Sequence, residues 1–191
     1  MEKDRLLAFS DGVIAIIITI MVLDLRVPHG ADLASLRPVL PVFLSYVLSF
    51  VYIGIYWNNH HHLFQLVRRV DGRLLWANLH LLFWLSLMPF ATGWMGENDF
   101  AAVPTALYGV ALLMPALAWS VLQRVLIATE GEDAPLTRVL GRDIRVKISP
   151  PLYCAGIASA FLDTRIADAL YVLVALIWLV PDRRIERAIG R

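Results

Sequence analysis

Three groups of polar residues interrupt the apolar stretches of this sequence. They are Ser10-Asp11, the run Asn-Asn-His-His-His at 58–62, and the pair Asn78 and His80. With a helical rise of about 1.5 Å per residue, each group lies roughly 8–15 Å from a nearby basic cluster. The three groups can therefore meet at one depth, where carboxylate, imidazole and amide groups could bind a metal ion, move protons or join helices.

A metal site and a proton relay both remain open from these residue types. A carboxylate with several imidazoles can bind zinc, but consecutive helical residues point about 100° apart, so the three histidines cannot share one ion. A structural network is the favoured interpretation, in which Ser10 and Asp11 bond to an imidazole, an indole or a guanidinium. We expect this network to comprise Arg5, Phe9, Ser10, Asp11, Trp57, His60, His61, Asn78 and His80.

The composition indicates the elements that must position these groups. Hydrophobic residues make up 59% of the chain and charged residues 17%, against about 25% charged in soluble domains. The charges cluster between long apolar runs, which predicts an all-α, multi-pass membrane protein forming a single domain over residues 1–191. No basic run resembles a nucleic-acid site, and one cysteine excludes an intrachain disulfide.

Six apolar runs are long enough to cross a bilayer, which takes about 20 residues. They cover residues 5–26, 39–67, 73–95, 101–128, 145–162 and 164–181. Pro38 and Pro41 are expected to open the second helix, where a missing N–H does little harm. The pair Pro150-Pro151 predicts a kink or a late start in the fifth helix, and the sixth helix is short.

Orientation follows from the distribution of basic residues. If the N-terminus is cytoplasmic, only Arg26, Arg37 and Arg165 of the 17 Lys and Arg residues lie on the outer side. The other 14 then lie on the cytoplasmic side, including the cluster Arg183, Arg184, Arg187 and Arg191 near the C-terminus. This asymmetry predicts an inner-membrane protein with both termini in the cytoplasm, in agreement with an even number of spans.

The first apolar helix carries a stripe of large side chains. Ile16, Ile20 and Leu23 follow i, i+4, i+7 spacing and share one face, with Thr19 beside it. From the spacing alone, an ordinary packing stripe is the expected interpretation. The sequence contains no Gly-rich phosphate loop, HExxH or GxSxG motif, so we expect neither an enzyme nor a bound cofactor.

Several motifs in order resemble the transmembrane protein 175 family of potassium channels. The first is Arg-x-x-x-Phe-Ser-Asp at 5–11, followed by the segment 19–28. Further similarity lies in Tyr-Trp-x-x-His-His-x-Leu-Phe at 56–64, Leu-Trp-x-Asn-Leu at 75–79 and Pro-Phe-x-Thr at 89–92. The resemblance covers roughly the first half of the chain, and the second half agrees only in length and number of spans.

The resemblance implies a homotetramer whose first helices line a central potassium pore. Its narrow point is then apolar, formed by Ile16, Ile20 and Leu23, with Thr19 as a polar residue facing the pore. Selectivity for potassium is expected to be modest, and the sequence lacks the Thr-Val-Gly-Tyr-Gly filter of ordinary potassium channels. In this interpretation the 5–11 motif anchors the pore helix and is not itself the ion's binding site.

Two other classes of function stay open. A proton-coupled secondary transporter could use Asp11 and the histidines, although such carriers often show internal repeats and none is visible here. A membrane-embedded enzyme or metal-binding protein is a third class. Potassium ions and lipid are the partners expected for a channel.

Overall fold

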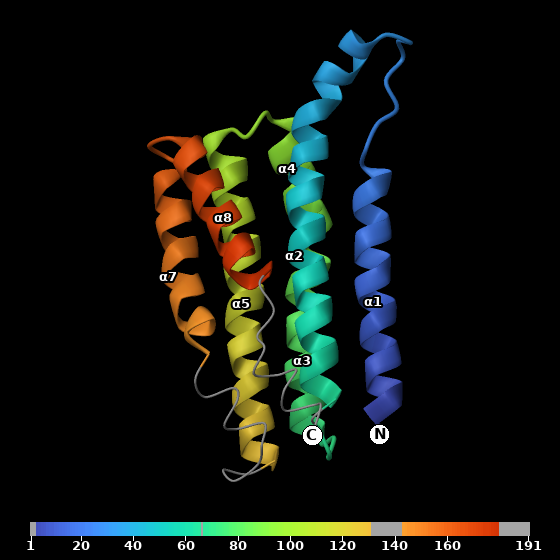
Figure 1. Cartoon of the computed structure of the whole chain (residues 1–191), viewed down its shortest axis with the longest axis vertical. Coiled ribbons are helices and arrows are strands. Elements are labelled where there is room, and N and C mark those ends of the chain that lie inside the picture. Colours follow the sequence, from blue (N-terminus) through green and yellow to red (C-terminus); the bar gives the residue numbers. More distant parts are fainter. Residues whose placement is uncertain (1–2, 66, 131–142, 180–191) are drawn as a thin grey trace.

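The computed structural model describes residues 3–65, 67–130 and 143–179, and every regular element in them is a helix. The helices form rods that run alternately up and down side by side (Figure 1). In chain order the rods are α1 (Lys3–Leu23), α2 (Leu40–Gln65), α3 (Gly72–Ser86) continued by α4 (Met88–Glu97), α5 (Ala102–Glu130), α7 (Ile144–Ser159) and α8 (Thr164–Leu179). The predicted all-α architecture of six helices is confirmed.

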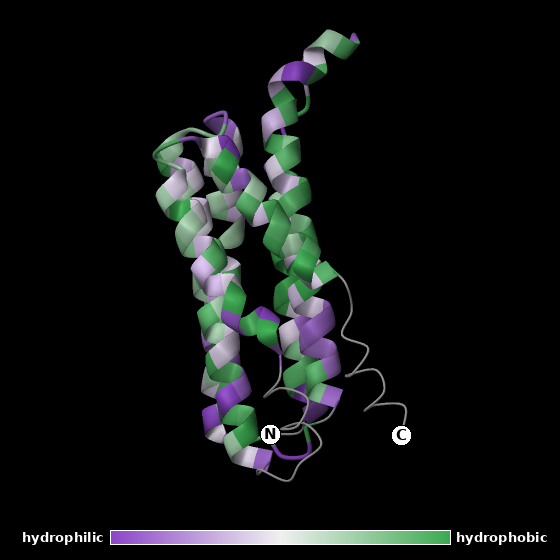
Figure 2. Ribbon diagram, turned by 60° about the vertical axis from the view of Figure 1, so that its left-hand side comes forward, coloured by the Kyte–Doolittle hydropathy of each residue, from purple (hydrophilic) through white to green (hydrophobic). Residues whose placement is uncertain are grey.

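Four of the six rods satisfy both the length and the hydropathy expected of a membrane span. They are Lys3–Leu23, Leu33–Gln65, Gly72–Glu97 and Ala102–Glu130. α7 and α8 each have 16 described helical residues, which is short for an upright span. Hydrophobic residues dominate the middle of the bundle and hydrophilic ones gather toward the ends of the rods, as a bilayer requires (Figure 2).

Prolines shape the second, third and fifth rods, in part as expected: Pro41 is the second residue of α2 and so lies in its opening turn. A 3₁₀ helix, η1 (Leu33–Val39), precedes α2 and contains Pro38. The third rod changes helix at Leu87, just before Pro89, so the predicted span 73–95 is two helices. α7 begins at Ile144 and contains Pro150 and Pro151, so of the two effects predicted for this pair, a kink or a late start, the late start is wrong.

Aspartates cap the N-terminal ends of η1 and α3. Asp71 accepts a hydrogen bond from the Leu74 N–H at 2.8 Å and so caps the start of α3. Asp32 accepts from the backbone N–H and hydroxyl of Ser35 at the start of η1. Those bonds hold the pKa of the Asp32 carboxyl below its ordinary value, because they favour the ionised form.

α1 lies at one edge of the bundle and packs against α2, α3 and α4 (Figure 1). Its buried residues follow helical spacing along one stripe: Leu6, Ser10, Ile14, Ile17 and Met21. The opposite face of α1 is not covered by any of the described residues. Residues 131–142, the C-terminal arginines and the C-terminus itself lie outside the described residues.

Candidate functional site

A buried hydrogen-bonded chain joins α1, α2 and α3 near the N-terminal end of α1. The Nε2–H of His60 donates to the Asn78 carbonyl oxygen at 2.7 Å, and the Asn78 amide donates to Ser10 Oγ at 2.9 Å. Ser10 in turn donates to the Leu6 carbonyl oxygen at 2.9 Å. All three side chains are almost fully buried, so each bond is shielded from competing water.

The donor and acceptor roles along this series of hydrogen bonds limit what it can do chemically. An amide oxygen only accepts, so His60 must carry its proton on Nε2. Its Nδ1 is buried without a hydrogen-bond partner among the described residues, and its ring stacks on Phe64 with centroids 4.3 Å apart. The chain ends at a backbone carbonyl and runs through an amide, neither of which passes a proton onward. The geometry therefore favours a structural link over a proton relay.

A second link joins α1 to α2 at the next residue of the motif. The Trp57 indole N–H donates to Asp11 Oδ1 at 3.1 Å. Trp57 also stacks on His61 with ring centroids 6.1 Å apart, and His61 hydrogen-bonds Gln65 at 2.9 Å. Asp11 thus bonds to an indole, one of the three partners considered from the sequence, and His61 supports that indole from the same helix.

The other predicted network residues lie elsewhere. Phe9 is 51% exposed and Arg5 is also exposed, both on the uncovered side of α1 and away from Ser10. His80 is exposed and accepts a hydrogen bond from Trp84, one turn along the same helix, at 2.9 Å. Within one chain, the structure joins Ser10, Asp11, Trp57, His60, His61 and Asn78 by direct or stacked contacts and leaves Arg5, Phe9 and His80 outside them.

The histidines do not converge on one point. His60 faces α3, whereas His61 faces Trp57 and Gln65 on its own helix. Among residues 3–65, 67–130 and 143–179, no three His, Cys, Asp or Glu side chains lie close enough to hold a metal ion. The arrangement resembles a set of interhelical ties and offers no ligand cage.

The residues predicted to face a pore all lie on the uncovered face of α1. The exposed fraction is 59% for Ile16, 45% for Ile20 and 76% for Leu23, and Thr19 is exposed as well. The Thr19 hydroxyl donates to the Ala15 carbonyl at 2.8 Å, so its oxygen lone pairs point away from the helix backbone as acceptors. A helix packed inside one bundle would bury such a stripe.

A second polar cluster escaped the sequence reasoning. Ser49 on α2 lies 2.7 Å from the Thr92 hydroxyl on α4 and 2.9 Å from the Tyr108 hydroxyl on α5. Thr92 also contacts the sulfur of Met21 on α1 at 4.0 Å. The sequence carries little signal for this cluster, because each of the three apolar runs contains two or more Ser, Thr or Tyr residues and nothing in their types indicates which of them meet.

Comparisons with known proteins agree with this architecture. Residues 5–89 match the family model described as endosomal/lysosomal potassium channel TMEM175. A potassium channel of Chryseobacterium sp. (strain P1-3) is 57% identical over 189 residues, covering 99% of this chain and 98% of that protein. The chain belongs to the TMEM175 family. A further relative, a potassium channel of Streptomyces collinus, is 35% identical, and the match covers 92% of this chain and 90% of that one.

A solved structure from the TMEM175 family shares the fold of nearly the whole chain. The crystal structure of a lysosomal potassium-selective channel TMEM175 homolog from Chamaesiphon minutus matches with a TM-score of 0.77. Sequence identity is 28%, and the match covers 93% of this chain and 96% of that one. Because the family model ends at residue 89, the placement of α5, α7 and α8 in the family fold rests on this structural match.

Proposed function

We propose that this chain forms a homotetrameric channel that conducts potassium ions passively through a central pore lined by α1. The observation that carries the proposal is the uncovered face of α1, on which Ile16, Thr19, Ile20 and Leu23 are all exposed. One helix cannot enclose a pore, whereas four copies arranged around an axis can place four such faces toward it. The names of the bacterial relatives, which are potassium channels, support the same conclusion.

The narrow point of the pore is apolar in this proposal. Rings of Ile16, Ile20 and Leu23 close the path by crowding and by excluding water, which is how hydrophobic constrictions gate. Thr19 lies between the first two rings, with its hydroxyl proton committed to Ala15, and offers its oxygen to a passing cation. Opening then requires the outer part of α1 to rotate or splay, and selectivity for potassium is modest.

The bonds from Ser10 to Asn78 and from Asp11 to Trp57 anchor each pore helix to α2 and α3. This anchor explains why a carboxylate and a buried imidazole occur inside a channel that needs no proton transfer. Arg5 and Phe9 share the uncovered side of α1 and are available to contact neighbouring subunits. No catalytic step belongs to this function.

The protein lies in the inner membrane in this proposal, with its N-terminus in the cytoplasm. Among the described residues, Arg68, Arg69, Arg73, Arg124, Arg145 and Lys147 belong to the same end of the bundle as Lys3 and Arg5. Arg26, Arg37 and Arg165 belong to the opposite end. Positive residues concentrate on the cytoplasmic side of membrane proteins, so the first end faces the cytoplasm.

Potassium flux into liposomes containing the purified protein, driven only by a potassium gradient, tests conduction. A channel gives flux at high rates with no required co-substrate, and clamping the pH gradient to zero leaves it unchanged. Saturable uptake that stops when the proton gradient is removed would favour the proton-coupled transporter instead. Mass measurement of the detergent-purified protein tests the tetramer, because a monomer excludes a central pore built from one helix per chain.

The constriction is tested by Ile16→Asn, which introduces an amide into the apolar ring. We expect flux to rise several-fold because water and hydrated ions enter the pore more easily. Val22→Asn is the matched control, because Val22 is also exposed on α1 but points about 120° away from Ile16. Equal effects of the two variants would contradict the assignment of Ile16 to the pore.

A further inference from the structure

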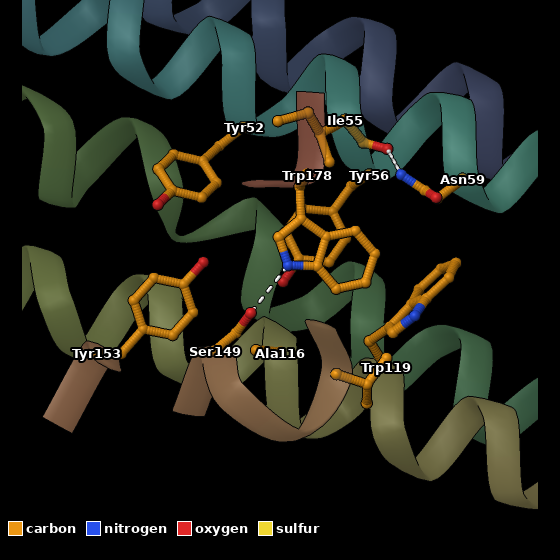
Figure 3. A pocket seen from close by; sticks show the side chains of 10 residues that line it. Tyr52, Ile55, Tyr56, Asn59, Ala116, Trp119, Ser149, Tyr153 and Trp178 are labelled. Atoms are coloured by element: carbon orange, nitrogen blue, oxygen red, sulfur yellow. Dashed lines mark hydrogen bonds between the residues drawn. The ribbon is translucent and has the colours of Figure 1, made fainter. Parts of the chain in front are cut away.

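A cavity lies inside the bundle between α2, α5, α7 and α8, far from the α1 face that the proposed function uses. Five aromatic side chains line it: Tyr52, Tyr56, Trp119, Tyr153 and Trp178 (Figure 3). The Trp119 side chain is buried, and its Nε1 has no hydrogen-bond partner among the described residues. An indole nitrogen can only donate, and a buried donor left unpaired is unfavourable.

Two other polar side chains of the cavity wall, Ser149 and Asn59, can each still accept a hydrogen bond. Ser149 Oγ donates to the Arg145 carbonyl at 2.8 Å and accepts from the Trp178 indole at 2.8 Å, which leaves one lone pair. The Asn59 amide nitrogen donates to the Ile55 carbonyl at 2.8 Å, which leaves the side-chain oxygen to accept. Besides the tyrosine hydroxyls, one unpaired donor and two side chains with acceptor capacity therefore line the cavity, and these three residues come from three different helices (Figure 3).

The size of the cavity limits its occupant. The centre of a water molecule can move over about 20 Å³ inside it. About 10–15 Å³ on this measure is enough for one water, which also needs two to four polar partners. A drug-sized ligand or a lipid chain does not fit this space, and a purely apolar cavity would stay dry.

We propose that this cavity is a binding site for one water molecule, which accepts a hydrogen bond from the Trp119 N–H and donates to Ser149 Oγ or the Asn59 side-chain oxygen. The bound water satisfies the orphan indole and ties α5 to α7 or α2. Arg145, whose guanidinium lies 4.8 Å from the centre of the Trp178 ring, flanks the same wall. The site is independent of how ions cross the membrane.

Ultraviolet resonance Raman spectroscopy tests the proposal, because the indole vibrations report whether the N–H is hydrogen-bonded. Subtracting the spectrum of Trp119→Phe from that of the full-length wild type isolates Trp119. Trp178→Phe isolates Trp178 in the same way and provides the hydrogen-bonded reference, because its partner Ser149 is known. We expect the Trp119 band at the position of the Trp178 band. A band at the position of a free indole N–H would overturn the proposal.

Filling the cavity tests whether the Trp119 N–H donates to a water molecule or to a protein group. Ala116 lines the cavity, and Ala116→Val adds two methyl groups to that wall. We expect this variant to expel the water and shift the Trp119 band to the free position, with the Trp178 band unchanged. A Trp119 band that stays bonded would overturn the proposal, because a protein group would then be the acceptor. An experimental density map of the wild type provides a test without any variant: an empty cavity, or one filled by a side chain, would also overturn it.

Discussion

The inner and outer halves of α1 are attached to the bundle by different kinds of interaction. The inner half, up to about Gly12, has directional hydrogen bonds from Ser10 to Asn78 and from Asp11 to Trp57. The outer half is held by apolar packing of Ile14, Ile17 and Met21, with one weak sulfur contact to Thr92. Hydrogen bonds fix the direction and register of a helix, whereas apolar contacts tolerate small rotations.

This difference is informative because the proposed pore residues all belong to the outer half. A pore helix that gates must keep one end fixed while the other end moves. The distribution of contacts on α1 matches that need: the inner end cannot turn without breaking its hydrogen bonds to Asn78 and Trp57, and the outer end can exchange one apolar contact for another. The predictions below test the two halves separately, beginning with the largest expected effect.

The largest effect is expected where the outer half is packed. Ile17 is 3% exposed and Ile16 is 59% exposed, although they are neighbours in sequence. Ile17→Asn buries an amide without a partner and removes apolar contacts, at a cost of more than about 3 kcal/mol. We expect little folded protein in size-exclusion chromatography, whereas Ile16→Asn is expected to express and fold normally. Similar yields of the two variants would show that this half of α1 does not pack as described.

The second prediction breaks the buried chain of the inner half. Asn78→Ala leaves the His60 N–H without an acceptor and removes the donor to Ser10, so we expect a loss of roughly 2–4 kcal/mol. Thermal unfolding followed by fluorescence-detected chromatography measures the loss. The control is Leu79→Ala, because Leu79 is 40% exposed on the same helix. If both variants lost the same stability, the buried hydrogen bonds of Asn78 would contribute nothing beyond ordinary side-chain packing.

The third prediction concerns the exposed link of the inner half. Trp57→Phe keeps an aromatic ring beside His61 but removes the N–H that binds Asp11. Because Trp57 is 46% exposed, we expect a loss of only about 0.5–1.5 kcal/mol. If the link also restrains the pore helix, the potassium flux per tetramer changes while the tetramer stays intact. Trp76→Phe is the control, since that indole is 75% exposed on α3, and an equal effect there would rule out a role for the hydrogen bond.

Much of the fold and part of the site could be predicted from the sequence, because straight helices convert residue spacing into depth. That conversion predicts the six rods. It also predicts that Ser10, Asn78 and a histidine meet at one depth. Depth alone does not say which way a side chain points. Three successive histidines point in directions that span about 200° around the helix, so only the packed structure identifies His60 as the one that faces Asn78.

The same limit explains why the predicted network includes residues that lie outside the observed one. Arg5 and Phe9 belong to the same short motif as Ser10, but the helix turns them to the uncovered face. The change of helix at Leu87 and the 3₁₀ helix before α2 depend on how proline-bearing segments pack, which local sequence does not specify. The cluster of Ser49, Thr92 and Tyr108 joins residues far apart in the chain, and no spacing rule connects them.

The smallest effect is expected at the outer end of α1, where an ion pair follows the helix. Arg26 lies 2.9 Å from Glu97 at the end of α4, and the exposed fractions of the two side chains are 85% and 50%. Exposed pairs contribute about 0–1 kcal/mol and weaken with salt, so Arg26→Gln should hardly change thermal stability. If the outer half of α1 moves during gating, however, this pair restrains that motion, and its loss should raise potassium flux at low ionic strength more than at high. Glu97→Gln removes the same pair from the other side and should give the same result. A salt-independent change, or opposite effects of the two variants, would mean that Arg26 acts on ions directly and not through α4.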